Sequence, residues 1–191
     1  SDEKVIDEIL NNEKVINELE KRIGEFLQEV MHTAIGEEQQ KKVGMLFNTV
    51  HDMERIGDHA ENLAEIAQYK IDNKVSFSSY AVEELKEIFE GVDMAMENAF
   101  LALSTEEASY VEAVDTNERK VDDLRDSFRE SHIDRINKSE CNVSAGVLFL
   151  EVLTNLERIS DHCVNVADVV RSVGKSRLKL DRISEIPPEK C

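Results

Sequence analysis

Hydrophobic residues recur every three or four positions along most of the chain, which is the spacing of helices that bury one face. The pattern predicts five long helices, over residues 2–34, 37–74, 79–103, 105–138 and 143–173. Gly36 interrupts the pattern between the first two, and residues 75–79 and 139–142 are expected to connect the others. Only two prolines and seven glycines occur in 191 residues, which favours an all-α protein.

Local side chains suggest where three of these helices begin or end. Ser78 or Ser79 is expected to cap the third helix. Residues 104–107 read Ser-Thr-Glu-Glu, a capping-box pattern that is expected to start the fourth helix. Gly174 stands where a C-cap glycine would end the fifth helix. Residues 175–191 are therefore predicted to form a basic, proline-containing tail that is frayed or loosely docked.

One stretch of eleven residues occurs twice. Residues 54–64 and 157–167 match at seven positions, 103 residues apart. The retained residue types are Glu, Arg, Ile, Asp, His, Asn and Ala, so most of what is retained is polar. Packing alone would preserve the apolar positions and let the polar ones change. The duplication therefore suggests a site that is made twice.

The repeated stretch places acidic side chains in a line. Glu54, Asp58 and Asn62 are four residues apart and share one helix face, and Glu157, Asp161 and Asn165 repeat this arrangement. Carboxylates at i and i+4 repel each other. Burial beside a core raises that cost unless a cation or a proton neutralises them.

A weaker repeat lies in the helix before each motif helix. Residues 13–19 align with residues 118–124, at a separation of 105 residues. These segments offer Glu13 with Asn17, and Glu118 with Asp122. Antiparallel packing would bring four oxygen-bearing side chains together in each repeat, a donor set that favours hard ions such as Mg, Mn, Ca or ferric iron. The alternative is that Arg55, Arg158 and other cations neutralise the acids in salt-bridge networks.

The two repeats are not equally complete. The first repeat, residues 1–74, has two predicted helices, whereas the second, residues 75–174, has three. Two helices alone would leave an apolar face exposed. Either a leading helix is absent from this chain, or another chain supplies it.

Composition limits the partners. The formal charge of −18 argues against nucleic acid and is compatible with metal cations, a basic partner or a simply solvated surface. The three cysteines are far apart and suit a reducing compartment, and Cys163 is expected to be a small core residue. No apolar run approaches the roughly 20 residues of a membrane span, and no signal peptide is recognisable. A soluble, cytoplasmic piece is expected.

The repeated motif closely resembles the signature of PhoU proteins, and the resemblance extends over residues 2–173. Residues 80–89 and 129–135 are most similar to the cytoplasmic PhoU-like domain that follows the membrane part of bacterial sodium/phosphate cotransporters. The resemblance implies tandem three-helix bundles, with the leading helix of the first bundle missing here. It also implies a non-enzymatic regulator of phosphate uptake at the inner face of the cell membrane. The implied partner is a membrane phosphate transporter, in cis or in trans, and a homo-oligomer is expected.

Some PhoU proteins hold multinuclear iron or zinc clusters on these acidic pairs, so the resemblance also implies metal ligands. Carried over by position, the ligands are Glu13, Asn17, Glu54 and Asp58 in the first repeat, and Glu118, Asp122, Glu157 and Asp161 in the second. Asn17 keeps an oxygen but loses a charge, which makes the first site the weaker one. The metal can also be absent, in which case the chain is a helical scaffold.

A di-iron carboxylate enzyme is a further alternative, but that chemistry usually uses Glu-x-x-His pairs, and neither motif helix contains one. His59 and His162 follow the Asp directly, so they point about 100° away and are expected to pack between helices or to support the ligands. One cationic patch is expected either to complement a helix C-terminus or to meet an acidic membrane surface or the chain's own acidic face. Its residues are Arg171, Lys175, Arg177, Lys179 and Arg182.

Overall fold

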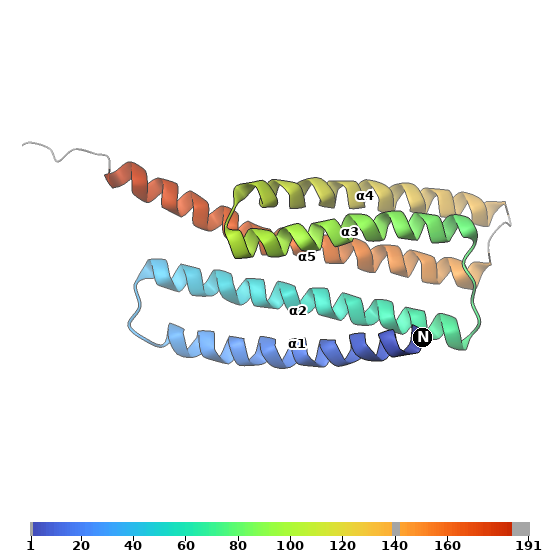
Figure 1. The fold of residues 1–191 in the computed structure, drawn as a ribbon, viewed down its shortest axis with the longest axis horizontal. Coiled ribbons are helices and arrows are strands. Elements are labelled where there is room, and N and C mark those ends of the chain that lie inside the picture. Colours follow the sequence, from blue (N-terminus) through green and yellow to red (C-terminus); the bar gives the residue numbers. More distant parts are fainter. Residues whose placement is uncertain (1, 139–141, 185–191) are drawn as a thin grey trace, which may run out of the picture.

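The computed structural model describes residues 2–138 and 142–184, and within these ranges every regular element is a helix (Figure 1). The helices are α1 (Asp2–Met31), α2 (Glu37–Asp72), α3 (Ser79–Thr105), α4 (Ala108–Asn137) and α5 (Val143–Ser184). The predicted all-α fold class is confirmed. In the described part of the chain, no helix is both long enough and apolar enough to cross a membrane.

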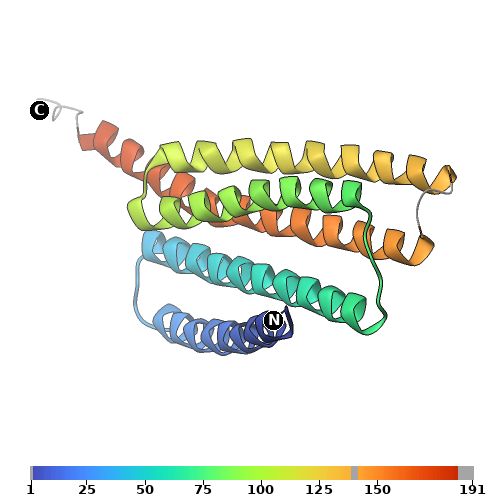
Figure 2. The same cartoon turned by 45° about the vertical axis from the view of Figure 1, so that its right-hand side comes forward.

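The second repeat forms a complete bundle, and the first repeat packs beside it. Helices α3, α4 and α5 all contact one another, α2 lies against α5, and α1 lies against α2 (Figures 1 and 2). The long α5 projects beyond the end of the bundle in both views. Helix α2 is thus the element of the first repeat that contacts the second repeat.

The hydrophobic core belongs mainly to the second repeat. Its largest fully buried apolar side chains all lie on α3, α4 or α5: Ile88, Val114, Val121, Phe149, Leu153, Leu156 and Val166. On α1, by contrast, Ile6 and Leu27 are the buried hydrophobic residues in the described part. The apolar faces of α4 and α5 are thus buried in the core, whereas much of the apolar face of α1 is exposed or half-buried.

The link between α3 and α4 differs from the capping box that the sequence suggests. Ser104 and Thr105 belong to the last turn of α3, where their hydroxyls donate to the Leu101 carbonyl at 3.1 and 2.8 Å. Glu106 ends α3 in a left-handed conformation (φ 58°), and Glu107 precedes α4 without a side-chain cap. The predicted start at residue 105 was wrong because both hydroxyls donate to a carbonyl of the preceding helix, and the amide from which Thr105 accepts, at 3.3 Å, is that of Glu107, which precedes α4. The cap at Ser78 is confirmed, since its hydroxyl accepts from the Ala81 amide at 3.2 Å.

The predicted end of the fifth helix at Gly174 was also wrong, because α5 continues to Ser184. A glycine inside a helix costs only about 1 kcal/mol relative to alanine, and the first proline comes at position 187. Part of the predicted tail is therefore helical, and residues 185–191 lie outside the described ranges. Of the cationic patch, Arg171 binds the chain's own acids: it donates to both oxygens of Asp115 at 2.8 and 2.7 Å.

Cys163 lies fully buried in the core of the second repeat, as expected for a small core residue. Burial raises the pKa of its thiol to about 12. A thiol in this environment is almost entirely protonated at neutral pH and is a poor nucleophile.

We therefore expect Cys163 to resist thiol reagents while the protein is folded. In a variant carrying Cys141→Ser and Cys191→Ser, Ellman's reagent at about pH 8 should release no thiolate until denaturant is added, after which one equivalent should react. The same variant unfolded in denaturant from the start is the control. Rapid stoichiometric reaction of the folded protein would show that this part of the core is open.

Candidate metal centre

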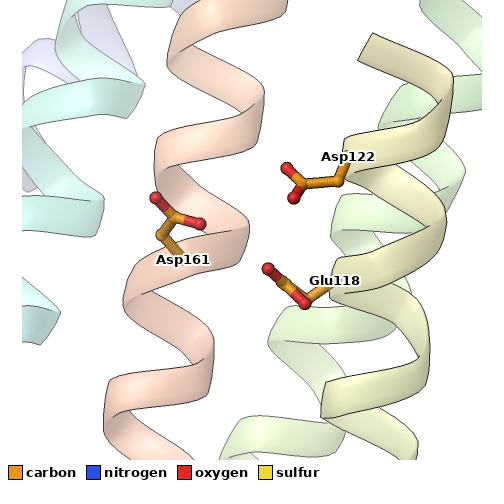
Figure 3. A group of neighbouring side chains, drawn as sticks. All are labelled: Glu118, Asp122 and Asp161. Atoms are coloured by element: carbon orange, nitrogen blue, oxygen red, sulfur yellow. The ribbon is translucent and has the colours of Figure 1, made fainter. Parts of the chain in front are cut away.

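The acids of the second repeat converge between α4 and α5. Glu118 and Asp122 project from α4, and Asp161 projects from α5 towards them (Figure 3). One oxygen of each lies within 4.8 Å of the other two, and all three side chains are half-buried. The antiparallel packing expected from the sequence therefore brings these three residues together. Such a set of carboxylate oxygens fits a hard cation better than one that prefers thiolate ligands.

The electrostatics of this cluster favour a neutralising partner. Burial, and then the Asp122 carboxylate, raises the pKa of Glu118 above its ordinary value. Burial, and then the Asp161 carboxylate, likewise raises the pKa of Glu157. Glu118 and Glu157 are thus harder to ionise than in water. Either a proton or a bound cation would relieve the repulsion between the carboxylates.

Two arginines already supply part of that charge. Arg125 places Nη2 3.4 Å from an oxygen of Asp122 and 3.5 Å from one of Glu157. Arg158 places Nη1 3.4 Å from Asp161 and Nε 3.7 Å from Glu157. Glu157 is therefore joined to the cluster through guanidinium groups. Arg119 is a third cation near the cluster, and its charge acts to lower the pKa of Glu118. Three cations against four carboxylates still leave an excess of negative charge, so the salt-bridge alternative accounts for only part of the neutralisation.

The acids of the first repeat are arranged differently. Asn17 donates a hydrogen bond to Glu13, and Arg55 lies 3.4 Å from Asp58 and 3.8 Å from Glu54. Within the described residues, Glu118, Asp122 and Asp161 form the single group of three potential metal ligands at this spacing. The structure thus brings together three of the four predicted ligands in the second repeat, and it does not gather Glu13, Glu54 and Asp58 in the same way.

Substitutions at equivalent positions explain this difference. The position of Arg125 is occupied in the first repeat by Glu20, and the position of Thr154 by His51. His51 Nδ1 lies 3.8 Å from Glu20 and 3.6 Å from Glu54. The acids of the first repeat therefore face an imidazole in place of the half-buried guanidinium of Arg125. Burial, and then Asp58, raises the pKa of Glu54.

The histidines of the motif connect the two repeats. The Nδ1 atom of His59 lies 2.9 Å from the side-chain oxygen of Asn155, to which Asn62 also donates at 3.1 Å. In the same way, His162 lies 2.9 Å from Asp52, to which Asn165 donates at 3.0 Å. The two imidazole rings stack with their centroids 5.7 Å apart. We call these two groups the inter-repeat clamps.

The clamps explain why the duplicated motif keeps His and Asn as well as its acids. Each motif helix presents its acids to the preceding helix of its own repeat, and its His and Asn to the other motif helix. The sequence reasoning missed Asp52 and Asn155. They are themselves 103 residues apart, two positions before the motif, so extending the repeat alignment by two residues would have found them.

The PhoU domain family model matches residues 1–67 and 85–170. The chain belongs to the PhoU family. A protein of Thermotoga maritima named phosphate-specific transport system accessory protein PhoU homolog 1 is 23% identical over 164 residues, covering 85% of this chain and 69% of that protein. A PhoU homolog of Xylella fastidiosa with the same accessory-protein name is 25% identical over 193 residues, covering 100% of this chain and 76% of its own length.

The fold agrees with a solved PhoU structure. The crystal structure of PhoU from Pseudomonas aeruginosa matches with a TM-score of 0.83 over 91% of this chain and 82% of that one, at 21% sequence identity. The PhoU resemblance read from the repeated motif is thus confirmed for the family and for the fold.

The clamps predict an unequal pair of coupling energies. In a double-mutant cycle of Asp52→Ala and His162→Ala, we expect a coupling of roughly 1.5–3 kcal/mol, because hydrogen bonds to charged groups are the stronger ones. The matched cycle of Asn155→Ala and His59→Ala should give roughly 0.5–1.5 kcal/mol, because its acceptor is a neutral amide. Urea unfolding measures both. Equal couplings, or none in either cycle, would contradict this account of the clamps.

The raised carboxyl pKa values predict how stability depends on pH. Because Glu118 and Glu157 bind protons more tightly in the folded state, their burial destabilises the metal-free protein at neutral pH. That cost diminishes as the pH falls through their raised pKa values towards the ordinary value of 4.5. The variant with Glu118→Gln and Glu157→Gln should therefore gain less stability between about pH 7 and pH 5 than the parent, as measured by urea unfolding with a chelator present.

The difference between the two proteins isolates these two glutamates. Burial lowers the pKa of His132, so protonation of this residue destabilises the folded protein as the pH falls. This effect is the same in both proteins and cancels in the comparison. Identical pH profiles for the parent and the double variant would show that neither glutamate carries the proton linkage.

Proposed function

We propose that this chain is a regulatory domain of phosphate uptake that performs no catalysis itself. Its membership of the PhoU family supports this, as do the relatives from Thermotoga maritima and Xylella fastidiosa, which are named accessory proteins of a phosphate-specific transport system. The motif helices contain no Glu-x-x-His pair of the kind that di-iron carboxylate enzymes use. The acidic cluster is better suited to holding a cation than to turning over a substrate.

We further propose that the second repeat binds a metal ion through Glu118, Asp122, Asp161 and Glu157. The observation that carries this proposal is the approach of three carboxylates from two helices to within 4.8 Å of one another. A divalent or ferric ion there would relieve a repulsion that the two arginines offset only in part. It would also tie α4 to α5 at the middle of the bundle, so that metal content and the stability of the domain would rise and fall together.

Arg125 has a particular part in this proposal. Its guanidinium bridges Asp122 and Glu157, so it competes for the same oxygens as the ion. Binding would require this side chain to turn outwards, where Asp126 already lies 3.3 Å from its Nε. The arginine would thus keep the ion-free cluster intact while lowering its affinity for metal. In the scaffold alternative no ion binds, and Arg125 stays permanently in its salt bridges with Asp122 and Glu157.

The partner that we propose is a membrane phosphate transporter, with this chain at the inner face of the membrane as part of a sodium/phosphate cotransporter or bound to one. The charge of −18 supports a basic partner. Cytoplasmic loops of membrane proteins carry an excess of Lys and Arg, so they offer a surface of that kind.

The test compares equivalent residues of the two repeats. We expect protein purified without chelator or an affinity column to contain iron, zinc or another divalent ion by elemental analysis. Asp161→Asn should lower the bound metal at least about tenfold, because it removes one of three converging carboxylates. Asp58→Asn, the same substitution in the first repeat, should have a much smaller effect. Arg125→Gln should raise both the affinity for added metal and the increase in Tm that it causes.

The same variants test the regulatory role when they are introduced into cells and phosphate uptake is measured. If Asp161→Asn alters the response of uptake to phosphate supply and Asp58→Asn does so less, the metal centre is part of the regulation. A change in uptake without any loss of bound metal would support the regulatory role and contradict the proposed metal centre. Unchanged metal content and unchanged uptake in both variants would favour the scaffold.

A further inference from the structure

Helices α2 and α5 together form a face that carries two grooves, of about 680 and 370 Å³. Within the described residues, both grooves are lined by side chains of α2 and α5 alone. The side chains of these helices that line a cavity together with α3, such as Leu63 and Leu156, belong to neither groove. The two grooves therefore lie on a face of α2 and α5 that α3 does not cover.

The two grooves are copies of each other, made by the internal duplication. Residues that line them lie 103 positions apart in the sequence, as the two copies of the motif do. Such pairs include Glu65 with Asp168, Ile66 with Val169, and Asn155 with Asp52. We call the first the Glu65 groove and the second the Asp168 groove. Because equivalent helices form them, each groove is a reference for the side chains of the other.

The acid that names the Asp168 groove is already paired within the chain. Arg171 places Nη1 2.5 Å from an oxygen of Asp168, which lies three residues before it. In the Glu65 groove the position of Arg171 is taken by Gln68, which donates to Asp72 at 2.9 Å. Among the described residues, Glu65 forms no ion pair. The Glu65 groove thus lacks the internal cation that its counterpart has.

A second carboxylate adds to the charge of the Glu65 groove. Glu151 of α5 lines this groove, whereas Asn48 of α2 stands at the equivalent position of the Asp168 groove. In the part of the chain that the structure describes, Glu151 also forms no ion pair, and no lysine or arginine lines the groove. Two carboxylates on facing helices, without a cation between them, favour a positively charged side chain from another molecule.

Exposed apolar side chains lie beside these acids. Tyr69 of α2 and Val147 of α5 are both 52% exposed, and the half-buried Ile66 lies in the same groove. At the equivalent positions of the other copy stand Ser172 and Gly44. The fold therefore does not require an apolar side chain at either position. Apolar side chains gathered in a groove and rimmed by polar ones are typical of a surface that binds a partner.

We propose that the Glu65 groove docks a short segment of a protein partner in which arginine or lysine flanks an aliphatic residue. The aliphatic side chain would pack against Ile66, Tyr69 and Val147. The cationic side chains would pair with Glu65 and Glu151. The inference rests on the proposed function, because it assigns to this groove the basic cytoplasmic segment of the transporter partner.

A second copy of this chain is a less suitable occupant. Each copy carries a formal charge of −18, so two copies repel each other at low salt. Residues 175–182 nevertheless form a basic stretch with leucines between the cations, which has the chemistry that the groove requires. The test therefore includes the mass of the chain in solution.

The test uses a fluorescein-labelled synthetic peptide, Gly-Ser-Arg-Leu-Arg-Ser-Gly, and measures its anisotropy as the chain is added. One control peptide has glutamine in place of both arginines, and another has alanine in place of leucine. We expect the arginine peptide to bind at least about tenfold more tightly than the glutamine peptide at about 0.15 M salt. Equal binding of these two peptides would overturn the proposal.

Variants at equivalent positions then locate the bound peptide. Glu65→Gln should weaken binding by about fivefold or more, whereas Asp168→Asn, which removes the same charge from the other groove, should change it by less than about twofold. Gln68→Arg copies the arrangement of Arg171 beside Asp168, so the chain's own guanidinium would neutralise Glu65. We expect this variant to bind the arginine peptide about tenfold more weakly. Unchanged binding by both Glu65→Gln and Gln68→Arg would contradict docking in this groove.

The apolar part of the groove has a test of its own. Tyr69→Ser gives the Glu65 groove the residue that its counterpart has at position 172. It should weaken binding of the leucine peptide by about fivefold and that of the alanine peptide by less than about twofold. Equal effects of Tyr69→Ser on the two peptides would show that charge alone attracts them and would overturn the proposal.

Two further measurements separate the docking surface from the proposed function. A parent chain that is a dimer in solution, but becomes a monomer with Tyr69→Ser, would assign the groove to a second copy and refute the proposal. If Gln68→Arg abolishes peptide binding but leaves the response of phosphate uptake unchanged in cells, the groove is supported and the transporter partner is not. If the arginine peptide does not bind while Asp161→Asn still alters uptake, the regulatory role is supported and the docking surface is refuted.

Discussion

The antiparallel packing of α2 against α5 is the interaction on which the other features depend. Both motif helices are held to each other through the inter-repeat clamps, in which His59 and His162 each reach across to the opposite helix. This contact fixes the rotation of each helix about its axis. Because Asp58 and Asp161 immediately precede these histidines, the same rotation directs the acids away from the interface and towards α1 and α4. A single helix–helix contact therefore sets the orientation of both acidic groups.

Periodicity and duplication were sufficient to predict the five helices and the convergence of Glu118 and Asp122 with Asp161. They failed where short-range competition decided the result. Ser104 and Thr105 have side chains that can cap either helix, and only the fold determines that they bond to the Leu101 carbonyl. Gly174 is a plausible stop in isolation, but the cost of one glycine inside a helix is too small to end α5, which continues to Ser184. The clamps were missed because Asp52 and Asn155 lie outside the motif and differ in type.

The first repeat also shows how a duplicated site changes its chemistry. Exchange of Arg125 for Glu20 replaces a cation with an acid at equivalent positions, and exchange of Thr154 for His51 adds an imidazole nearby. Asn17 removes a further carboxylate. The first repeat therefore has neither the three converging acids nor the guanidinium that holds the acids of the second repeat. The retained Glu and Asp of a motif do not by themselves preserve a ligand set, because the residues on the facing helix determine what those acids encounter.

The unequal distribution of the core has a consequence for the motions of the domain. Opening α1 exposes few buried side chains, whereas separating α4 from α5 exposes most of the core. Amide protons of α1 should therefore exchange with solvent when α1 alone detaches from α2. Those of α4 and α5 should exchange only when the whole domain unfolds. The half of the molecule that detaches most readily is also the half in which the motif acids remain apart. The domain thus combines a slowly exchanging half with one that can respond to its surroundings on a much shorter timescale.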